Sequence, residues 1–265
     1  MNQLKKILRH KRKEVEERKA SIAVEFLQSQ SSVRAAPRNF VEALRAAPMG
    51  MGLIAEIKRK SPSAGRIRRG VRVDHIAEQY QEAGAQALSI LADTRFFGGK
   101  ESDFVEIRDV TDIPVLYKEF VVDCWQVWHA AALGSSAVLL IVAALPGDEL
   151  ASMIDCVRRA RLTALVEVHT AEDLERIQGM DVACVGINNR DLTTFEVSLD
   201  TTFRLRDAVP AGALVVSESG IRSADDVVRL KAAGVEAVLV GEHLLRQEHP
   251  GQAARELMSG VWTSS

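Results

Sequence analysis

Three segments of the chain repeat one design, and this repetition limits the possible folds most strongly. They read EAGAQALSIL, ALGSSAVLLIV and AAGVEAVLVG, and in each a helical pattern ends at a glycine that an apolar strand soon follows. Gly84, Gly134 and Gly234 suit the end of a helix because glycine adopts a positive φ at little cost. Their spacings of 50 and 100 residues indicate a repeating unit of about 25 residues, one strand plus one helix.

Strand candidates also occur at the expected spacing in the gaps between these segments. The eight predicted strands are residues 53–57, 87–91, 114–118, 137–142, 162–169, 182–188, 213–219 and 236–241. Helices are predicted at 74–83, 123–133, 148–160, 170–177 and 223–233, several opened by Asp, Ser or Thr in the N-cap position. Eight such units predict an α/β fold, the (β/α)8 TIM barrel. A doubly wound sheet is less favoured, because no G-x-G-x-x-G follows the first strand.

We expect residues 1–48 to form an N-terminal helical extension and residues 49–265 to form a single catalytic barrel domain. Leu4, Leu8 and Val15 form a narrow apolar stripe on a background of Lys, Arg and Glu, which is typical of a helix. We expect these charges to form a solvated face, although the extension could also cover one end of the barrel.

The composition excludes several classes of partner and location. A formal net charge of −2 argues against nucleic acid, because phosphate-backbone binders are usually strongly basic. No apolar run approaches the roughly 18 residues of a membrane span, so no membrane partner is expected. The charged start of the chain does not resemble a secretory signal peptide, which favours a cytoplasmic location. Nothing in the sequence marks a subunit interface, and we expect a monomer.

The three cysteines are predicted to be reduced thiols. Cys124, Cys156 and Cys184 are odd in number and far apart in the sequence, with no Cys-x-x-Cys pair and no matching histidine spacing. The pattern therefore supports neither a disulfide framework nor a zinc site. We expect no metal.

Charged and polar side chains gather where the predicted strands end. In a barrel these carboxyl ends form one mouth, where the chemistry lies. The residues are Glu56, Lys58, Asp93, Lys118, Glu119, Glu167, His169, Asn188, Arg190, Glu218 and Ser219. Charges at strand ends are costly to bury unless they are paired, so a purely structural ring of ion pairs is the alternative to an active site. We interpret His169 as a surface residue, because a lone histidine at a loop entrance is more often surface than catalytic.

Glycine-rich turns predict a phosphate site at the same mouth. SESGI and VGEHL place Gly220 and Gly241 after the seventh and eighth strands, where this fold commonly binds phosphate on backbone N–H groups. The SPSAG loop after the first strand adds Ser61 and further backbone donors. A phosphorylated small-molecule substrate is therefore expected.

Taken in order, several motifs resemble those of the indole-3-glycerol-phosphate synthase family of tryptophan biosynthesis. They are AEIKRKSPS, LADTRFFGG, YKEF, VLLIV, LVEVH, GINNRDL, SESGI and LVGEHL, and the resemblance covers nearly the whole chain. Three positions depart from the family pattern: Tyr117 stands where arginine is frequent, Glu119 where aspartate is usual and Ala92 where threonine is. The length excludes the bifunctional forms that carry a second barrel.

The resemblance implies a carboxy-lyase (EC 4.1.1.48). It would close the pyrrole ring of 1-(2-carboxyphenylamino)-1-deoxyribulose 5-phosphate and release carbon dioxide and water by general acid/base catalysis. By resemblance Lys118 is the acid for ring closure and Glu167 the base for dehydration, with Lys58 a competing acid. Glu56 and Glu218 would orient the lysines, and Asn188 would hold a substrate hydroxyl. No cofactor is implied, because ring closure creates its own electron sink.

The resemblance also assigns the groups that bind the substrate. Arg190 offers a planar fork for the carboxylate. An apolar slot for the anthranilate ring is assigned to Phe97, Phe120 and Leu139, although a Phe-Phe pair such as Phe96–Phe97 is more often simple core. The residues expected at the phosphate end are Ser61, Ser219, Gly220, Gly241 and Glu242.

Three other functions remain open on the sequence alone. A phosphate-binding barrel isomerase such as phosphoribosylanthranilate isomerase would share the last two units, but it would not need both Lys58 and Lys118. A Schiff-base aldolase would use Lys118 as a nucleophile. A non-catalytic barrel that binds a sugar phosphate or a protein would not need three acids and two lysines at one mouth.

Overall fold

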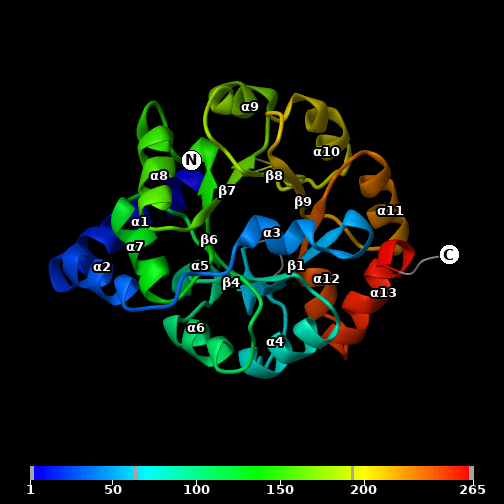
Figure 1. The fold of residues 1–265 in the computed structure, drawn as a ribbon, viewed down its shortest axis with the longest axis horizontal. Coiled ribbons are helices and arrows are strands. Elements are labelled where there is room, and N and C mark those ends of the chain that lie inside the picture. Colours follow the sequence, from blue (N-terminus) through cyan, green and yellow to red (C-terminus); the bar gives the residue numbers. More distant parts are fainter. Residues whose placement is uncertain (1–2, 63–64, 192–193, 263–265) are drawn as a thin grey trace.

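The fold was analysed in a computed structural model that describes residues 3–62, 65–191 and 194–262. Eight parallel strands close into a barrel in the order β1-β10-β9-β8-β7-β6-β5-β4, with helices around it (Figure 1). The barrel strands are β1 (Gly52–Ile57), β4 (Ala87–Leu91), β5 (Val115–Lys118), β6 (Ala137–Ile141), β7 (Thr163–Val168), β8 (Cys184–Asn188), β9 (Leu214–Glu218) and β10 (Ala237–Val240). All eight strand predictions are confirmed to within two residues at each end. The TIM-barrel prediction is correct, and the doubly wound alternative is wrong because the sheet closes.

The outer helices follow the strands as the repeating unit predicts. They are α4 (Val73–Glu82), α6 (Glu101–Arg108), α7 (Cys124–Ala132), α8 (Glu149–Arg159), α9 (Ala171–Ile177), α10 (Asp200–Leu205), α11 (Ala224–Ala232) and α13 (Pro250–Trp262). No bounds were assigned from the sequence to helices α6, α10 and α13. The short helices α5 (Thr94–Phe97) and α12 (Glu242–Leu245) and the hairpin of β2 (Lys60–Ser61) and β3 (Gly65–Arg66) were not predicted either.

Local signals explain where these helices begin and end. Asp123, Thr170 and Ser223 are N-caps whose side chains accept backbone N–H groups of the first turn. Gly84 ends α4 with a φ of +93°, as its position in the repeat predicts. Helix α4 begins at Val73, one residue before the predicted start, so Asp74 lies in its first turn.

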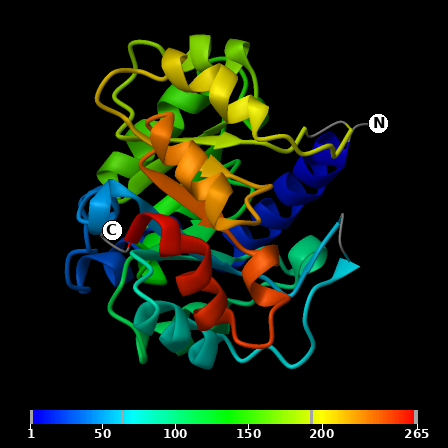
Figure 2. The same cartoon turned by 90° about the vertical axis from the view of Figure 1, so that its right-hand side faces the viewer.

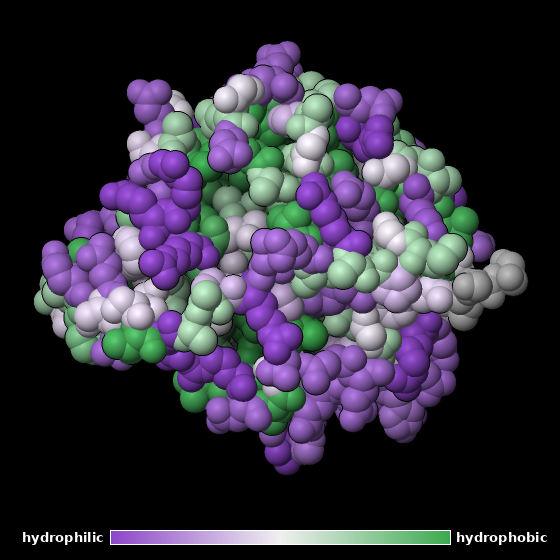
Figure 3. Space-filling model, in the orientation of Figure 1, coloured by the Kyte–Doolittle hydropathy of each residue, from purple (hydrophilic) through white to green (hydrophobic). Residues whose placement is uncertain are grey.

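Apolar side chains fill both the interior of the barrel and the layer between strands and helices. Ile54, Leu116 and Leu165 are fully buried inside the barrel. One larger cluster, rich in Val, Ile and Leu, fills the outer layer under helices such as α4 and α13. Figure 3 shows the face seen in Figure 1, where hydrophilic residues cover most of the rim. The rigid double core holds the carboxyl ends of the strands in place.

The N-terminal extension places helices at both ends of the barrel. Helix α1 (Gln3–Ser21) contributes Leu4 and Ile7 to the cavity at the carboxyl ends of the strands. Helix α3 (Phe40–Arg45) lies at the other end, where Phe40 and Leu44 close the base of the barrel core. Figure 2 shows α1, in dark blue, and the paler α3 on opposite sides of the strands. Helix α2 (Val24–Ser32) packs beside α7.

The prediction of three reduced thiols is wrong for two of them. Cys124 and Cys156 form a disulfide between α7 and α8, with a Cα–Cα distance of 6.0 Å. The two residues are 32 positions apart in the sequence, but successive helices are neighbours around the barrel. Cys184 is free and buried. Within the described ranges, no helix has the length and apolar character that crossing a membrane requires.

Candidate active site

A cavity of about 740 Å³ opens at the carboxyl ends of the strands. The residues that the sequence assigned to catalysis and to substrate binding all lie on its wall. They are Glu56, Lys58, Ser61, Phe97, Lys118, Phe120, Leu139, Glu167, Asn188, Arg190, Glu218, Ser219, Gly220, Gly241 and Glu242. All eight barrel strands supply polar or apolar groups to it, so closure of the sheet is what brings these residues together.

Glu56 and Lys58 form the first ion pair of the cavity. Both side chains leave β1 on the same side of the chain, because alternate residues of a strand share a face. Lys58 Nζ donates to Glu56 Oε1 at 2.6 Å, and Ser89 Oγ donates to Glu56 Oε2 at 3.2 Å. Burial alone would raise the pKa of Glu56, but Lys58 and Lys118 outweigh it, and the pKa is lowered. Glu56 is therefore an ionised partner for the lysines.

Lys118 lies between two carboxylates. Its Nζ donates to Glu218 Oε2 and lies 3.6 Å from Glu167 Oε2. Burial opposes the charge on Lys118, but Glu218, Glu167 and Glu56 together raise its pKa above the ordinary value. Lys118 is consequently protonated at neutral pH and can act as a proton donor.

Glu218 is the most deeply enclosed acid of the group. Burial raises its pKa to about 7, although the Lys118 charge opposes the rise. Gly186 on β8 makes room for this carboxyl, because a Cβ at that position would lie 2.2 Å from Glu218 Oε1. The sequence reasoning missed Gly186. Its signal was a glycine inside a strand, which often marks the close approach of another group.

The apolar and glycine-rich parts of the wall lie on opposite sides of the ring of strands. Phe97 and Phe120 follow β4 and β5, and their ring centroids are 6.0 Å apart. Ser219 and Gly220 follow β9, which is diametrically across from β5 in the strand order. A ligand that spans the cavity can therefore place an aromatic ring at one end and an anion at the other.

The turn after β9 holds an unusual backbone conformation. Ser219 and Gly220 have φ values of +69° and +83°. A left-handed serine costs about 1–2 kcal/mol, and such strain persists mainly where function requires the geometry. Arg222 and Arg246 also line this end of the cavity. They were missed in the sequence, although Arg222 directly follows SESGI.

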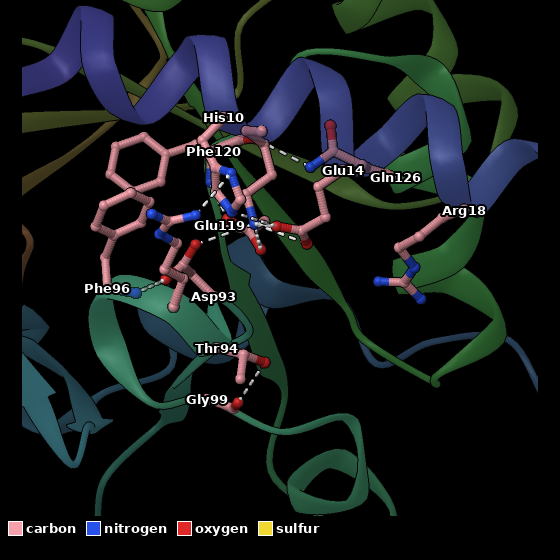
Figure 4. A network of polar contacts seen from close by, with 12 residues as sticks. His10, Glu14, Arg18, Asp93, Thr94, Phe96, Gly99, Glu119, Phe120 and Gln126 are labelled. Atoms are coloured by element: carbon pink, nitrogen blue, oxygen red, sulfur yellow. Dashed lines mark hydrogen bonds and ion pairs between the residues drawn. The ribbon is translucent and has the colours of Figure 1, made fainter.

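A second buried ion cluster joins the extension to the cavity wall. Lys11 of α1 is 1% exposed, and its Nζ lies 3.0 Å from both Asp93 Oδ2 and Glu119 Oε2. Figure 4 shows Asp93 and Glu119 converging beneath α1, with Glu14 beside them. Burial raises the pKa of Glu119 to about 7, although Lys11 opposes the rise. The prediction of a solvated charged face on this helix is therefore wrong for Lys11.

Comparison with known proteins identifies the family. The family model described as indole-3-glycerol phosphate synthase matches residues 4–257. The chain is 44% identical over 257 residues to the indole-3-glycerol phosphate synthase of Acidithiobacillus ferrooxidans, covering 96% of this chain and 97% of that one. It is 45% identical over 256 residues to the enzyme of the same name from Aromatoleum aromaticum, covering 96% and 98%. The chain belongs to the indole-3-glycerol phosphate synthase family.

Among solved structures, the likeness extends to the fold alone. A crystal structure of 3-hexulose-6-phosphate synthase has a TM-score of 0.64 at 14% identity and covers 80% of this chain and all of that one. A mandelate oxidase mutant has a TM-score of 0.56 at 17% identity, covering 80% and 71%. These proteins share the barrel with the synthase family.

One prediction about the site of this family member needs correction. His169 is not a surface residue, because its side chain is 9% exposed and its Nε2 lies 3.3 Å from Glu167 Oε1. Asp173 of helix α9 lies near the other ring nitrogen, with its Oδ2 3.9 Å from Nδ1. A local sequence cannot show that a following helix will cover a side chain at a strand end.

Proposed function

We propose that this chain converts 1-(2-carboxyphenylamino)-1-deoxyribulose 5-phosphate to indole-3-glycerol phosphate in tryptophan biosynthesis, as a carboxy-lyase of class EC 4.1.1.48. The observation that carries the proposal is Lys118, held between two carboxylates in a cavity with an aromatic end and a glycine-rich end. Membership of the family supports the same reaction. The substrate has an aromatic ring at one end and a phosphate at the other, which suits this cavity.

Ring closure needs a proton donor at the substrate ketone. As the aromatic carbon that bears the carboxylate attacks the ketone carbon, the ketone oxygen becomes a hydroxyl and takes a proton from Lys118. The raised pKa of Lys118 keeps it in the protonated form that this step requires. The same protonation argues against the Schiff-base aldolase, which needs a neutral amine as nucleophile.

The two later steps use the charge that ring closure creates. The bond to the carboxylate breaks, carbon dioxide leaves, and its electron pair neutralises the cationic iminium. The hydroxyl then leaves as water with a proton from Lys58 or Lys118. Glu167 removes the ring proton that completes the pyrrole, while Glu56 and Glu218 orient the lysines and Asn188 holds a substrate hydroxyl.

Substrate binding is proposed to divide between the two ends of the cavity. Ser61, Ser219, Gly220 and Gly241 would surround the phosphate, and Glu242 borders them. The anthranilate ring would lie against Phe97, Phe120 and Leu139. Arg190 would take the substrate carboxylate. The common position of these residues on one cavity wall supports this division.

The proposed reaction can be tested directly with purified protein. Addition of the carboxyphenylamino substrate without added metal is expected to produce indole fluorescence with release of one carbon dioxide for each product. An aminoketose-forming isomerase or a simple binding protein would yield neither signal. Absence of both carbon dioxide and fluorescence would overturn the proposed function.

Activity is expected to survive dialysis against EDTA. In the described part of the chain, no group of three or more His, Cys, Asp or Glu side chains is arranged to hold a metal ion. The proposed chemistry also supplies its own electron sink. Initial rates before and after chelation should agree, and activity that vanished and returned with one divalent ion would contradict this prediction.

Replacement of Gly241 by alanine is expected to raise KM by roughly tenfold, the effect of losing contacts to a charged group. A Cβ there would lie 2.6 Å from Glu56 Oε1, so the substitution also displaces the carboxylate that holds Lys58, and kcat should fall as well. Steady-state kinetics and a melting curve on one preparation measure this. An unchanged KM and kcat with a normal melting curve would remove Gly241 from the site.

We propose that the protein acts as a cytoplasmic monomer with no nucleic-acid partner. Its substrate belongs to amino-acid biosynthesis, and its formal net charge is −2. Light scattering of the purified protein would test the oligomeric state.

A further inference from the structure

His169 is a buried titratable group that the mechanism above does not use. It follows β7 two residues after Glu167, and the cavity wall, as far as the structure describes it, does not include it. Neither ring nitrogen makes a well-oriented hydrogen bond within the described ranges. Burying such a ring without hydrogen-bond partners costs free energy. The charged groups around the ring therefore need to be considered.

Carboxylates flank both ring nitrogens of His169. Nε2 lies 3.3 Å from Glu167 Oε1, and Nδ1 lies 3.9 Å from Asp173 Oδ2. The other charged groups that act on the ring are Lys118 on β5, Glu218 on β9 and Asp191 after β8. A neutral imidazole carries one N–H donor, so it can serve only one of the two flanking carboxylates.

The two carboxylates differ in the hydrogen bonds that they already accept from other groups. Asp173 Oδ2 accepts the backbone N–H groups of His169 and Thr170 at 2.9 and 3.3 Å, as part of the cap of α9. Glu167 Oε1 is the nearer acceptor, while Glu167 Oε2 faces Lys118 at 3.6 Å. The single donor of a neutral ring is therefore better used on Glu167. Burial lowers the pKa of His169, which favours that neutral form.

Building on the proposed role of Glu167 as base, we propose that His169 is a positioning residue whose Nε2–H binds Glu167 Oε1 and leaves Oε2 directed at the substrate. The donor stabilises the ionised carboxylate, which is the form that can remove the ring proton. It also fixes the rotation of the carboxyl group, so that the reacting oxygen faces the cavity. His169 itself touches neither substrate nor reacting atoms.

Two polar replacements separate this role from simple packing. His169→Gln can place an amide N–H near the position of Nε2, whereas His169→Asn reaches only the position of Nδ1. We expect His169→Asn to lower kcat about tenfold and to move the acidic limb of the pH–kcat profile upward by about one unit, the effect of losing a hydrogen bond to a charged group. His169→Gln should retain most of kcat and the parental limb.

Two further variants make the outcome decisive. His129→Asn is the matched control, since His129 is also buried but stacks on Trp125 away from the cavity; its acidic limb should not move. Glu167→Gln should abolish most activity, and adding His169→Asn to it should cause no further loss. If Glu167→Gln is inactive but the Asn and Gln variants of His169 share the parental profile, the inference about His169 alone is overturned. If Glu167→Gln remains active, Glu167 is not the base, and the proposed role of His169 is also wrong.

Discussion

Replacement of Lys118 by methionine is expected to lower kcat by about 10² to 10⁴, the usual cost of losing a general acid. Methionine keeps much of the apolar stem but cannot protonate the substrate ketone. The variant also removes the cation between Glu218 and Glu167. Because Glu218 already has a pKa of about 7, it can take up a proton and limit the loss of stability. The variant should therefore lose most of its kcat but little of its folding stability.

The matched control for this experiment is Lys58→Met, which removes the other cavity lysine. If Lys118 serves ring closure and Lys58 serves dehydration, a single turnover of Lys118→Met should release no carbon dioxide. Lys58→Met should release carbon dioxide without forming the fluorescent indole. Rapid-quench measurement of both products, with the melting temperature of each variant, tests this assignment. A near-normal kcat for Lys118→Met would contradict the proposed mechanism. It would favour the alternative in which these charges form a purely structural ring of ion pairs.

Replacement of Lys11 by methionine is expected to lower the free energy of unfolding by about 3–5 kcal/mol at pH 8, as is typical when one partner of a buried ion pair is removed. Lys11 is 1% exposed, and it neutralises Asp93 and Glu119, both of which are also buried. Without it, two neighbouring carboxylates are left in a water-poor site beneath α1. Urea unfolding followed by circular dichroism measures the change.

The loss should depend on pH in a defined direction. In the folded protein the pKa of Glu119 is raised to about 7 from 4.5, so the folded state binds more protons than the unfolded state between these values. The contribution of Glu119 to the free energy of unfolding therefore falls as the pH rises from about 4.5 to about 7. Removing Lys11 raises the pKa of Glu119 further, because Lys11 opposes the rise. The destabilisation should therefore be smaller at pH 5.5 than at pH 8.

Two variants check that the effect belongs to this cluster. Lys13→Met changes the same helix at a side chain that is 78% exposed, and it should alter stability by less than about 0.5 kcal/mol. Adding Glu119→Gln to Lys11→Met should restore part of the lost stability at pH 8, because one buried charge is removed. Equal stabilities for Lys11→Met and Lys13→Met would show that the buried pair contributes nothing measurable.

The barrel and the members of its cavity could be predicted from the sequence because both depend on short-range patterns. A strand and a helix each show their own periodicity, and Gly84, Gly134 and Gly234 mark where helices end. Once eight parallel strands close, their carboxyl ends must share one mouth. The positions of Glu56, Lys118 and Glu218 on one wall follow from that closure and needed no knowledge of side-chain contacts.

The tertiary structure alone decided which of these groups meet. Lys118 binds Glu218 most closely, Lys11 enters a buried site between Asp93 and Glu119, and Cys124 reaches Cys156. His169, which its own sequence neighbourhood indicated to be exposed, lies between Glu167 and Asp173 of α9. Apart from the contact of His169 with α9, these contacts join elements that are far apart along the chain. They depend on side-chain directions and on the packing of helices against the barrel, which the local sequence does not encode.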